Sequence, residues 1–185
     1  MRDLVVTENI TVDGVIDASE GWFTPSGGED GNAAEMAEVQ RKHMSGADAV
    51  LLGRVTYQEF ESYWPLQTDD PTGVSDYLNR TTKYVVSGTL SAPTWANTAV
   101  LRGPLADDVA ALKEQPGQAI VATGSIRLVH ALVRSGLVDE YRLFVYPVVL
   151  GRGARLFEGA TDLPELRLVE ARPFSSGVVL LRYRT

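Results

Sequence analysis

The chain contains no cysteine, and this absence limits the chemistry that it can carry out. A chain without thiols forms no disulfide, zinc ribbon or iron–sulfur cluster, and it has no catalytic thiolate. The two histidines, His43 and His130, lie far apart in the sequence, so we expect no metal site. The lack of cysteine also favours a reducing compartment.

Long apolar runs and clusters of positive charge are missing as well. The longest strongly apolar stretch, residues 143–150, is far shorter than the roughly 20 residues of a membrane-spanning helix. No cationic leader precedes the first apolar segment, so we expect no secretory signal and a cytoplasmic protein that stays out of the membrane. The 17 Lys and Arg residues are scattered among 24 Asp and Glu residues, and the net charge of −7 argues against binding to nucleic acid.

What the chain does contain is enough apolar sequence for one domain. Its 185 residues, of which 44% are hydrophobic, predict a single domain over residues 1–185. Buried strands are predicted at 4–7, 49–52, 84–86, 98–101 and 119–122, with helical patterns between most of them. From Val138 onward only strands are predicted, at 141–150, 166–171 and 178–183, with a hairpin turn at 175–177. This order predicts a three-layer α/β/α fold, in which a mostly parallel central sheet carries antiparallel C-terminal strands.

Capping residues indicate where two of the helices begin. Asn32 with Glu35, and Thr56 with Glu59, have the spacing of a capping box, in which both side chains bond the first turn of a helix. We therefore predict one helix after Asn32 and a second helix from Thr56 to the Trp64-Pro65 stop. Residues 17–32 are rich in glycine, serine and acidic residues and are predicted to form an exposed loop.

The last predicted helix follows Ser125 and ends at Gly136, which is well placed for a left-handed C-terminal cap. Its apolar face is opposite a polar stripe that we expect to face solvent, made of Arg127, His130 and Arg134.

Three predicted strands end in glycine or serine where a helix or loop begins, at Gly53-Arg54, Ser87-Gly88 and Thr123-Gly124-Ser125. In an open parallel sheet, ligands bind beyond the carboxyl ends of the strands, where helix N-termini offer free N–H groups. Gly53 and Gly124 would let a phosphate approach the backbone, and Arg54 adds a guanidinium suited to phosphate oxygens. The pattern predicts a ligand that carries phosphate. The alternative is ordinary turn chemistry at each position, with Arg54 as a surface ion-pair partner.

Six short motifs extend along the chain. They are Thr11-Val12-Asp13-Gly14, Leu52-Gly53-Arg54-Val55-Thr56-Tyr57, Val85-Val86-Ser87, Thr123-Gly124-Ser125, Gly136-Leu137-Val138-Asp139-Glu140 and Pro147-Val148-Val149-Leu150-Gly151-Arg152-Gly153. In this order they resemble the dihydrofolate reductase-like family, which includes the reductase domain of bacterial riboflavin biosynthesis. The resemblance covers residues 4–183.

The resemblance implies an NADPH-dependent reductase whose cofactor lies across the strand ends. In proteins of this kind the Gly-Arg-x-Thr turn holds cofactor phosphate, so Arg54 and Thr56 are the implied ligands of the pyrophosphate or the 2′-phosphate. The other implied cofactor-binding residues are Ser87 and Gly88 on the adenosine side, and Gly124 and Ser125 on the pyrophosphate. The resemblance also implies a homodimer, which would cover the apolar edge of the C-terminal strands.

The implied chemistry is hydride transfer to a polarised C=N or C=O carbon of a small pteridine-like or pyrimidine-like substrate. Asp13 matches the family loop that faces the nicotinamide, which implies a carboxylate that contacts substrate or relays a proton. An Asp-Gly turn is the alternative role. Glu38 is a second catalytic candidate, because folate enzymes carry a substrate-binding carboxylate on the corresponding helix. Glu35 lies on that helix too but already has a capping role, and this departure argues against folate as substrate.

A competing function is a non-catalytic protein that binds a dinucleotide or another phosphate ligand on the same scaffold. His43, near the end of its helix, is expected to interact with the helix dipole, and a position near the cleft stays open. Aromatic residues beside the predicted cleft either stack on a planar heterocycle or cover the core, and these are Trp22, Phe23, Tyr57, Tyr63 and Trp64.

Overall fold

The computed structural model describes residues 1–19, 21–23, 33–161 and 163–185. Its strands are β1 (Leu4–Thr11), β2 (Ala47–Gly53), β3 (Thr82–Val86), β4 (Thr98–Leu101), β5 (Ala119–Ala122), β6 (Glu140–Tyr146), β7 (Arg167–Pro173) and β8 (Val179–Arg184). Its helices are α1 (Ala33–Ser45), α2 (Arg54–Tyr63), the short 3-10 helix η1 (Trp64–Leu66), α3 (Val74–Arg80), α4 (Leu105–Glu114) and α5 (Ile126–Arg134).

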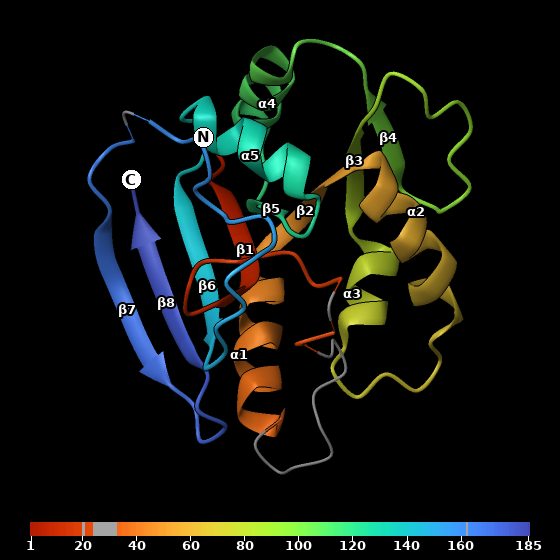
Figure 1. Cartoon of the computed structure of the whole chain (residues 1–185). Helices are drawn as coiled ribbons and strands as arrows, with labels where there is room; N and C mark the ends of the chain where they lie inside the picture. The colour runs from red at the N-terminus through yellow and green to blue at the C-terminus, as the bar shows by residue number, and fades with distance from the viewer. Residues whose placement is uncertain (20, 24–32, 162) are drawn as a thin grey trace.

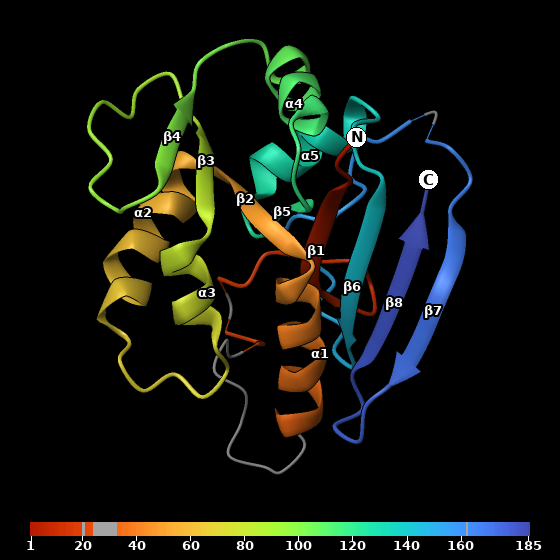
Figure 2. The same ribbon diagram turned by 180° about the vertical axis from the view of Figure 1, so that it is seen from behind.

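All of these strands form one sheet in the order β4-β3-β2-β5-β1-β6-β8-β7. The pairs from β4 to β6 are parallel, and β8 and β7 are added as antiparallel pairs. Figure 1 shows the β7–β8 hairpin on one side of the molecule and β3 and β4 on the opposite side, and Figure 2 shows the same arrangement from behind. The predicted α/β fold with antiparallel C-terminal strands is confirmed.

Helices cover both faces of the sheet, and each strand contributes alternate side chains to the two faces. Val109 of α4 and Val129 of α5 pack on one face, against Leu4, Val6, Leu51, Ile120 and Leu143. On the other face, Leu78 of α3 packs with Val50, Leu52 and Val85, while Val39 of α1 packs with Phe144 and Leu180. This two-sided burial explains why the strands read as continuous apolar runs in the sequence.

The connections around β5 open a crevice at its carboxyl end. After β1 and β2 the chain passes to helices on the face covered by α1, α2 and α3, whereas after β5 it passes to α5 on the opposite face. β5 lies between β2 and β1 in the sheet. The segment that follows β5 therefore leaves toward one face, while the segments that follow its two neighbours leave toward the other face. Open α/β sheets bind their ligands at such points.

Several predicted boundaries were wrong, for local reasons. Helix α2 begins at Arg54, so Thr56 lies in its first turn and not at its N-cap position. The strand predicted to run to residue 150 ends at Tyr146, before Pro147, which has no N–H to donate to the sheet.

Helix α3 was not predicted, because it is only seven residues long. The Asp70 carboxylate accepts hydrogen bonds from the Thr72 and Ser75 N–H groups (2.9 and 2.8 Å) and so organises the turn before the helix. Its apolar residues Val74, Tyr77 and Leu78 do have helical spacing, but they span little more than one turn.

The prediction that Asn32 caps α1, and most of the predicted 17–32 loop, lie outside the described residues. Glu35 reaches across to the β7–β8 turn, where it accepts hydrogen bonds from the Ser175 N–H and hydroxyl (3.4 and 3.3 Å). The turn at 175–177 is present, with the Gly177 N–H bonded to the Phe174 carbonyl. Gly136 has the predicted left-handed conformation (φ 61°). His130 is partly exposed, on the same side of α5 as the exposed Arg127 and Arg134, and its Nε2 lies 2.8 Å from the Arg155 carbonyl.

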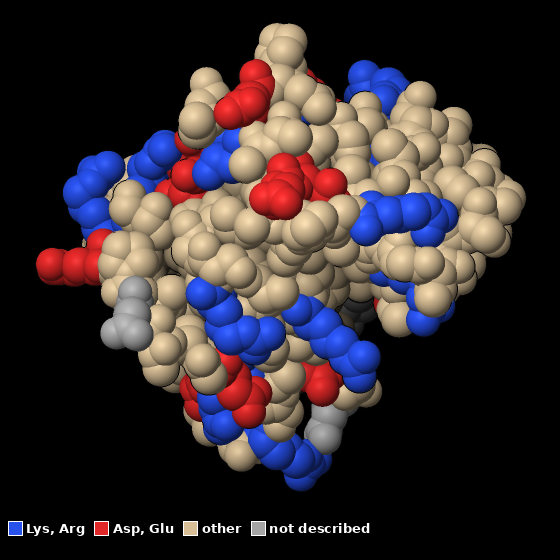
Figure 3. Space-filling model, turned by 90° about the horizontal axis from the view of Figure 1, so that it is seen from above, with Lys and Arg blue, Asp and Glu red and all other residues tan. Residues whose placement is uncertain are grey.

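Charged side chains of both signs lie side by side on the face shown in Figure 3, which carries no single basic field. Among the described residues, no helix combines the length and apolar character needed to cross a bilayer. No group of His, Asp or Glu in the described part of the chain has the arrangement of a metal site.

Candidate functional site

The three turns predicted to bind phosphate lie along one edge of the sheet. Gly53, the last residue of β2, pairs with Val86, the last residue of β3, whereas β5 ends at Ala122, opposite Leu51, so its carboxyl end lies two residues short of the end of β2. The turns that follow these strands are therefore neighbours, and two of them open directly into α2 and α5. The structure brings together the residues at 53–56, 87–88 and 124–125.

Ser125 joins two of these turns by a reciprocal pair of hydrogen bonds. The Gly53 N–H donates to Ser125 Oγ (2.9 Å), and the Ser125 N–H donates to Thr56 Oγ1 (3.0 Å). Thr56 therefore binds the neighbouring turn and does not form the predicted capping box with Glu59. The pair fixes the start of α2 relative to the start of α5.

The backbone at this junction is strained. Gly124 and Ser125 are both left-handed (φ 58° and 47°), which is costly for a residue with a side chain such as Ser125. A Cβ at Gly124 would lie 3.2 Å from Thr56 Cγ2, so glycine also allows the close approach of the two turns. Strain of this kind persists where the surroundings hold it, and it is typical of ligand-binding turns.

Two exposed arginines add positive charge to this edge. Arg54 is the first residue of α2, and its guanidinium contacts only Gln58 Oε1 (2.8 Å) among the described residues. Ser87 Oγ caps the turn after β3 by accepting from the Leu90 N–H (3.0 Å), and Gly88 is exposed with open space around it. Arg102, which sequence reasoning missed, donates to the Ser87 carbonyl (3.3 Å). Guanidinium groups beside helix N-termini suit the phosphates of a dinucleotide.

A cavity of about 580 Å³ opens next to the turn at Gly124. It lies mainly over the face of the sheet covered by α1, α2 and α3, with Thr7 and Asn9 of β1 in its floor. Beyond the end of β5 its lining also includes Glu8, which alternates to the face of Leu4 and Val6. Its wall is rich in aromatic residues, namely Phe23, Phe60, Tyr63, Trp64, Tyr77 and Phe144. Aromatic walls of this kind hold planar ring systems.

Buried polar atoms without partners gather around this same cavity. Among the described residues, the buried side-chain atoms without a hydrogen-bond partner are Glu8 Oε1, Asn9 Oδ1, His43 Nδ1 and Tyr77 Oη. All four belong to residues that line the cavity. Since an unpaired buried polar atom costs free energy, their gathering in one place points to a ligand with polar edges.

Glu8 is a functional candidate that the sequence analysis missed. Its side chain is 5% exposed, and burial raises its pKa well above the ordinary range, while a hydrogen bond from the Gly124 N–H offsets part of that shift. The signal in the sequence was a charged residue on the same strand face as Leu4, Val6 and Ile10. The strand prediction ended at Thr7, so that signal was not used.

The structure shows whether His43 and the aromatic residues lie at the cleft or in the core. His43 lines the cavity, and burial together with the nearby Arg142 and Arg182 lowers its pKa to about 4, so it is neutral at neutral pH. Phe23, Tyr63 and Trp64 line the cavity, whereas Tyr57 is fully buried in the core. Trp22 packs against Phe23 and Tyr146.

Asp13 and Glu38, the two predicted catalytic carboxylates, do not line this cavity. Asp13 accepts hydrogen bonds from the Thr11 hydroxyl (2.6 Å) and the Gly151 N–H (2.8 Å), and these donors lower its pKa to about 2. A carboxylate so fully ionised holds the turn at Gly151 and is unsuited to donating a proton. Glu38 is exposed on the outer side of α1, whereas Gln40, His43 and Met44 of that helix face the cavity.

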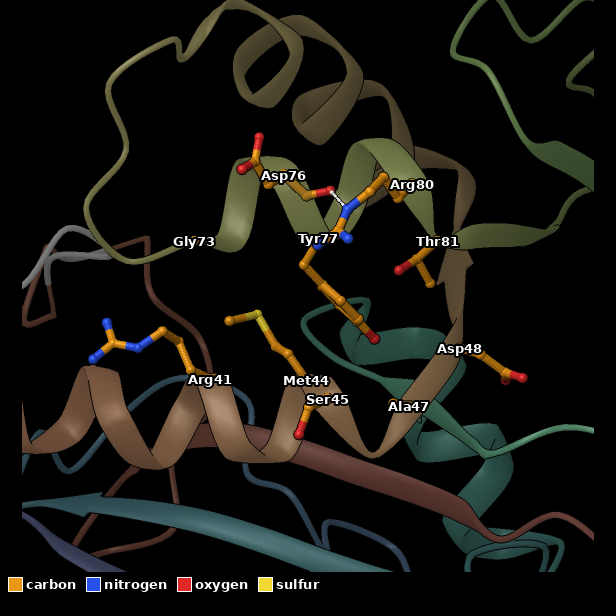
Figure 4. Close-up of a pocket in the computed structure, with 10 residues that line it drawn as sticks. All are labelled: Arg41, Met44, Ser45, Ala47, Asp48, Gly73, Asp76, Tyr77, Arg80 and Thr81. Atoms are coloured by element: carbon orange, nitrogen blue, oxygen red, sulfur yellow. Dashed lines mark hydrogen bonds between the residues drawn. The ribbon is translucent and has the colours of Figure 1, made fainter.

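A second cavity, of about 500 Å³, lies between α1 and α3 and is drawn in Figure 4. Figure 4 shows Tyr77 reaching from α3 into the space between the helices, and both Tyr77 and Met44 also line the first cavity. Arg41 and Arg80 line the second cavity together with Asp48 and Asp76, so its charge is balanced. Asp48 is further neutralised by its ion pair with Arg2. We assign no ligand to this space.

Comparison with known proteins places the chain in a family. The Bacillus subtilis protein YyaP is 34% identical over 139 residues, which cover 74% of this chain and 73% of YyaP. A putative riboflavin biosynthesis protein from Shewanella sp. PV-4 has a similar structure, with a TM-score of 0.70 and 18% identity over 98% of both chains. A deaminase/reductase from Thermotoga maritima, diaminohydroxyphosphoribosylaminopyrimidine deaminase/5-amino-6-(5-phosphoribosylamino)uracil reductase, has a TM-score of 0.66 at 17% identity, and the match covers 99% of this chain but 56% of that one. The family model of the RibD C-terminal domain matches residues 2–180, and the chain belongs to this family.

Proposed function

We propose that this protein is an NADPH-dependent reductase that adds a hydride to a C=N or C=O bond of a small, planar heterocycle. The observation that carries the proposal is the position of Gly124, which belongs both to the strained turn between β5 and α5 and to the wall of the aromatic cavity. A dinucleotide held at the turn would therefore place its far end at the cavity. Membership of the RibD C-terminal domain family supports a reductase, as does the activity in the name of the Thermotoga maritima protein.

The residues at the sheet edge fit the phosphates of this cofactor. Arg54 offers an exposed guanidinium, bonded to Gln58 alone among the described residues, at the start of α2, and the exposed Gly88 leaves room beside Ser87 for a nucleoside. Gly53, Thr56, Gly124 and Ser125 form the hydrogen-bonded junction that holds the starts of α2 and α5 together, and the positive ends of the two helix dipoles favour an anion there. When bound, the reduced nicotinamide supplies the hydride.

The cavity residues fit a substrate that is flat and carries polar edges. Aromatic side chains would stack on its faces, while Asn9 Oδ1, His43 Nδ1 and Tyr77 Oη would satisfy donors and acceptors along its rim. The cation in the cavity, Arg142, is already engaged by Glu140, with 2.7 Å between Arg142 Nε and Glu140 Oε1. The resemblance to riboflavin-pathway reductases makes 5-amino-6-(5-phosphoribosylamino)uracil the first substrate to test, and 7,8-dihydropterin the second.

Calorimetry with NADPH tests the cofactor, using Arg54→Ala and Arg134→Ala as a matched pair. Both arginines are exposed, but Arg134 lies at the far end of α5. Loss of one charge-assisted contact costs about 1.5–3 kcal/mol, so Arg54→Ala is expected to weaken NADPH binding by roughly 10- to 100-fold, while Arg134→Ala leaves it unchanged. Equal affinity in the two variants would show that the cofactor phosphate lies elsewhere. No binding by the wild-type protein at millimolar NADPH would rule out the reductase.

Turnover is measured as NADPH oxidation with each of the two substrates. Tight NADPH binding without oxidation in either case would favour the competing function, a non-catalytic dinucleotide-binding protein.

The expected homodimer stays a prediction. Leu168 and Val169 of the edge strand β7 are 51% and 42% exposed, so a second subunit would have apolar side chains to cover there.

A further inference from the structure

Glu8 lies where β1 loses one of its two neighbours. The pairing of β1 with β5 ends at Val6, opposite Ala122, whereas the pairing of β1 with β6 continues to Thr11. From Thr7 onward, the side of β1 that faced β5 is therefore open to the crevice at the carboxyl end of β5. Thr7, Glu8 and Asn9 line the cavity at this point.

The carboxyl group of Glu8 is buried without a counter-ion. Its pKa is raised by burial, and the one opposing influence is the Gly124 N–H, so no cation among the described residues holds the charged form. Oε1 has no hydrogen-bond partner in the described part of the chain. Burial favours the protonated form of this carboxyl group, and one of its oxygens is left for a ligand.

The other titratable and charged groups of the cavity do not serve equally well as an acid. His43 from α1 is neutral because its pKa is about 4, and burial raises the pKa of Tyr77 from α3 to about 12. Glu59 and Tyr63 from α2 are exposed at the rim. Arg142 from β6 is paired with Glu140. Glu8 is also hydrogen-bonded to the turn at Gly124, on the cofactor side of the cavity.

We propose that Glu8 is the catalytic acid of this site, an inference that rests on the proposed reductase. Glu8 donates its carboxylic proton to the nitrogen or oxygen of the substrate C=N or C=O bond, which receives the bond's electron pair. The carbon of that bond takes up the hydride, for which the reduced nicotinamide cofactor is the reductant. Glu8 is left as a carboxylate and regains a proton from water once product leaves the cavity.

The test variant is Glu8→Gln, which keeps the size of the side chain and an oxygen that accepts from the Gly124 N–H, but removes the acidic proton. Glu114→Gln, on the exposed end of α4, is the matched control. Glu8→Gln is expected to lower the rate constant of NADPH oxidation by roughly 10²- to 10⁴-fold, the usual range for a general acid. NADPH affinity is expected to stay within about threefold of the wild type, and Glu114→Gln is expected to match the wild type in both measurements.

Infrared spectroscopy gives a reading that needs no turnover. The wild-type protein at neutral pH is expected to show the C=O band of a protonated carboxylic acid that is missing in Glu8→Gln and retained in Glu114→Gln. If the difference between the wild-type and Glu8→Gln spectra contains only carboxylate bands, the proposal is overturned. If Glu8→Gln does not fold, the rate constant of the wild-type protein is measured as a function of pH instead. It must fall as pH rises through the pKa of Glu8. A rate constant that does not change with pH overturns the assignment.

The failures of the two proposals are distinguishable. If the wild-type protein oxidises NADPH and the rate constant of Glu8→Gln is within threefold of the wild-type value, Glu8 is not the catalytic acid. The proposed reductase would then still stand. Wild-type protein that neither binds nor oxidises NADPH would overturn the reductase, and the proton donation with it.

Discussion

Replacing Ser125 by alanine and, separately, by glycine will separate two effects at the centre of the proposed cofactor site. Ser125 has a left-handed backbone (φ 47°, ψ 48°), and its hydroxyl accepts a hydrogen bond from the Gly53 N–H at 2.9 Å. Both variants lose the hydroxyl. The glycine variant also loses the Cβ that makes the left-handed conformation costly.

The magnitudes follow from these two features. Leaving the half-buried Gly53 N–H without an acceptor costs about 1–3 kcal/mol, so both variants are expected to be less stable than the wild type. Relief of the left-handed strain returns about 1–2 kcal/mol to the glycine variant, of which about 0.5–1 kcal/mol is lost to the greater freedom of glycine in the unfolded chain. Ser125→Gly is therefore expected to be about 0.5–1 kcal/mol more stable than Ser125→Ala.

Urea unfolding measures the stability difference, and calorimetry measures NADPH affinity in the same preparations. Ser135→Ala, at the opposite end of α5, is the control for the loss of a serine hydroxyl. If Ser125→Ala is as stable as Ser125→Gly or more stable, the argument from backbone strain is refuted. Unchanged NADPH affinity in both Ser125 variants would refute the argument that this turn holds the cofactor.

Two pH-dependent predictions concern the other unusual groups. Asp13→Asn is expected to lower the melting temperature at neutral pH, because it weakens the hydrogen bonds to Thr11 and Gly151. The difference in melting temperature from the wild type should disappear as pH falls from about 3.8 toward 2, since the lowered pKa of Asp13 lies at the end of this range. An unchanged gap in thermal scans at low pH would contradict this role. His43, whose pKa is lowered to about 4, is expected to stabilise the fold fully above about pH 6.5 and to lose that contribution as pH falls toward 4. An NMR titration of His43 checks this directly, and an ordinary pKa near 6.5 would show that the ring is solvated.

Much of the fold could be predicted from local sequence patterns. Strand segments such as Val50 to Leu52 are apolar on both faces, and this pattern is produced by a parallel sheet covered on both sides. Features that depend on distant partners could not be predicted. Thr56 lies in the first turn of α2 and bonds Ser125, which is far away in the sequence.

The proposed site shows the same division. The turns at Gly53-Arg54, Ser87-Gly88 and Gly124-Ser125 were found from the sequence, because strand ends and helix starts leave a local signal in glycine, serine and arginine. Glu38 was placed by the helix it occupies, but the direction in which it points depends on how α1 packs, and it points to solvent. Asp13 was placed by its motif, while its hydrogen bonds to Leu150 and Gly151 come from a segment that only folding brings near.

The sequence by itself determined the composition limits, the α/β class with its antiparallel C-terminal strands, and the edge of the sheet at which a phosphate ligand is expected. These properties depend on residue types and on short spacings along the chain. Within the described part of the chain, the tertiary structure alone decided that Glu8 is buried without a counter-ion, that Asp13 accepts several hydrogen bonds, and that four unpartnered polar atoms gather around one cavity. Burial and hydrogen bonding of a side chain are set by residues from other strands and helices, and no local pattern encodes which of these neighbours will meet.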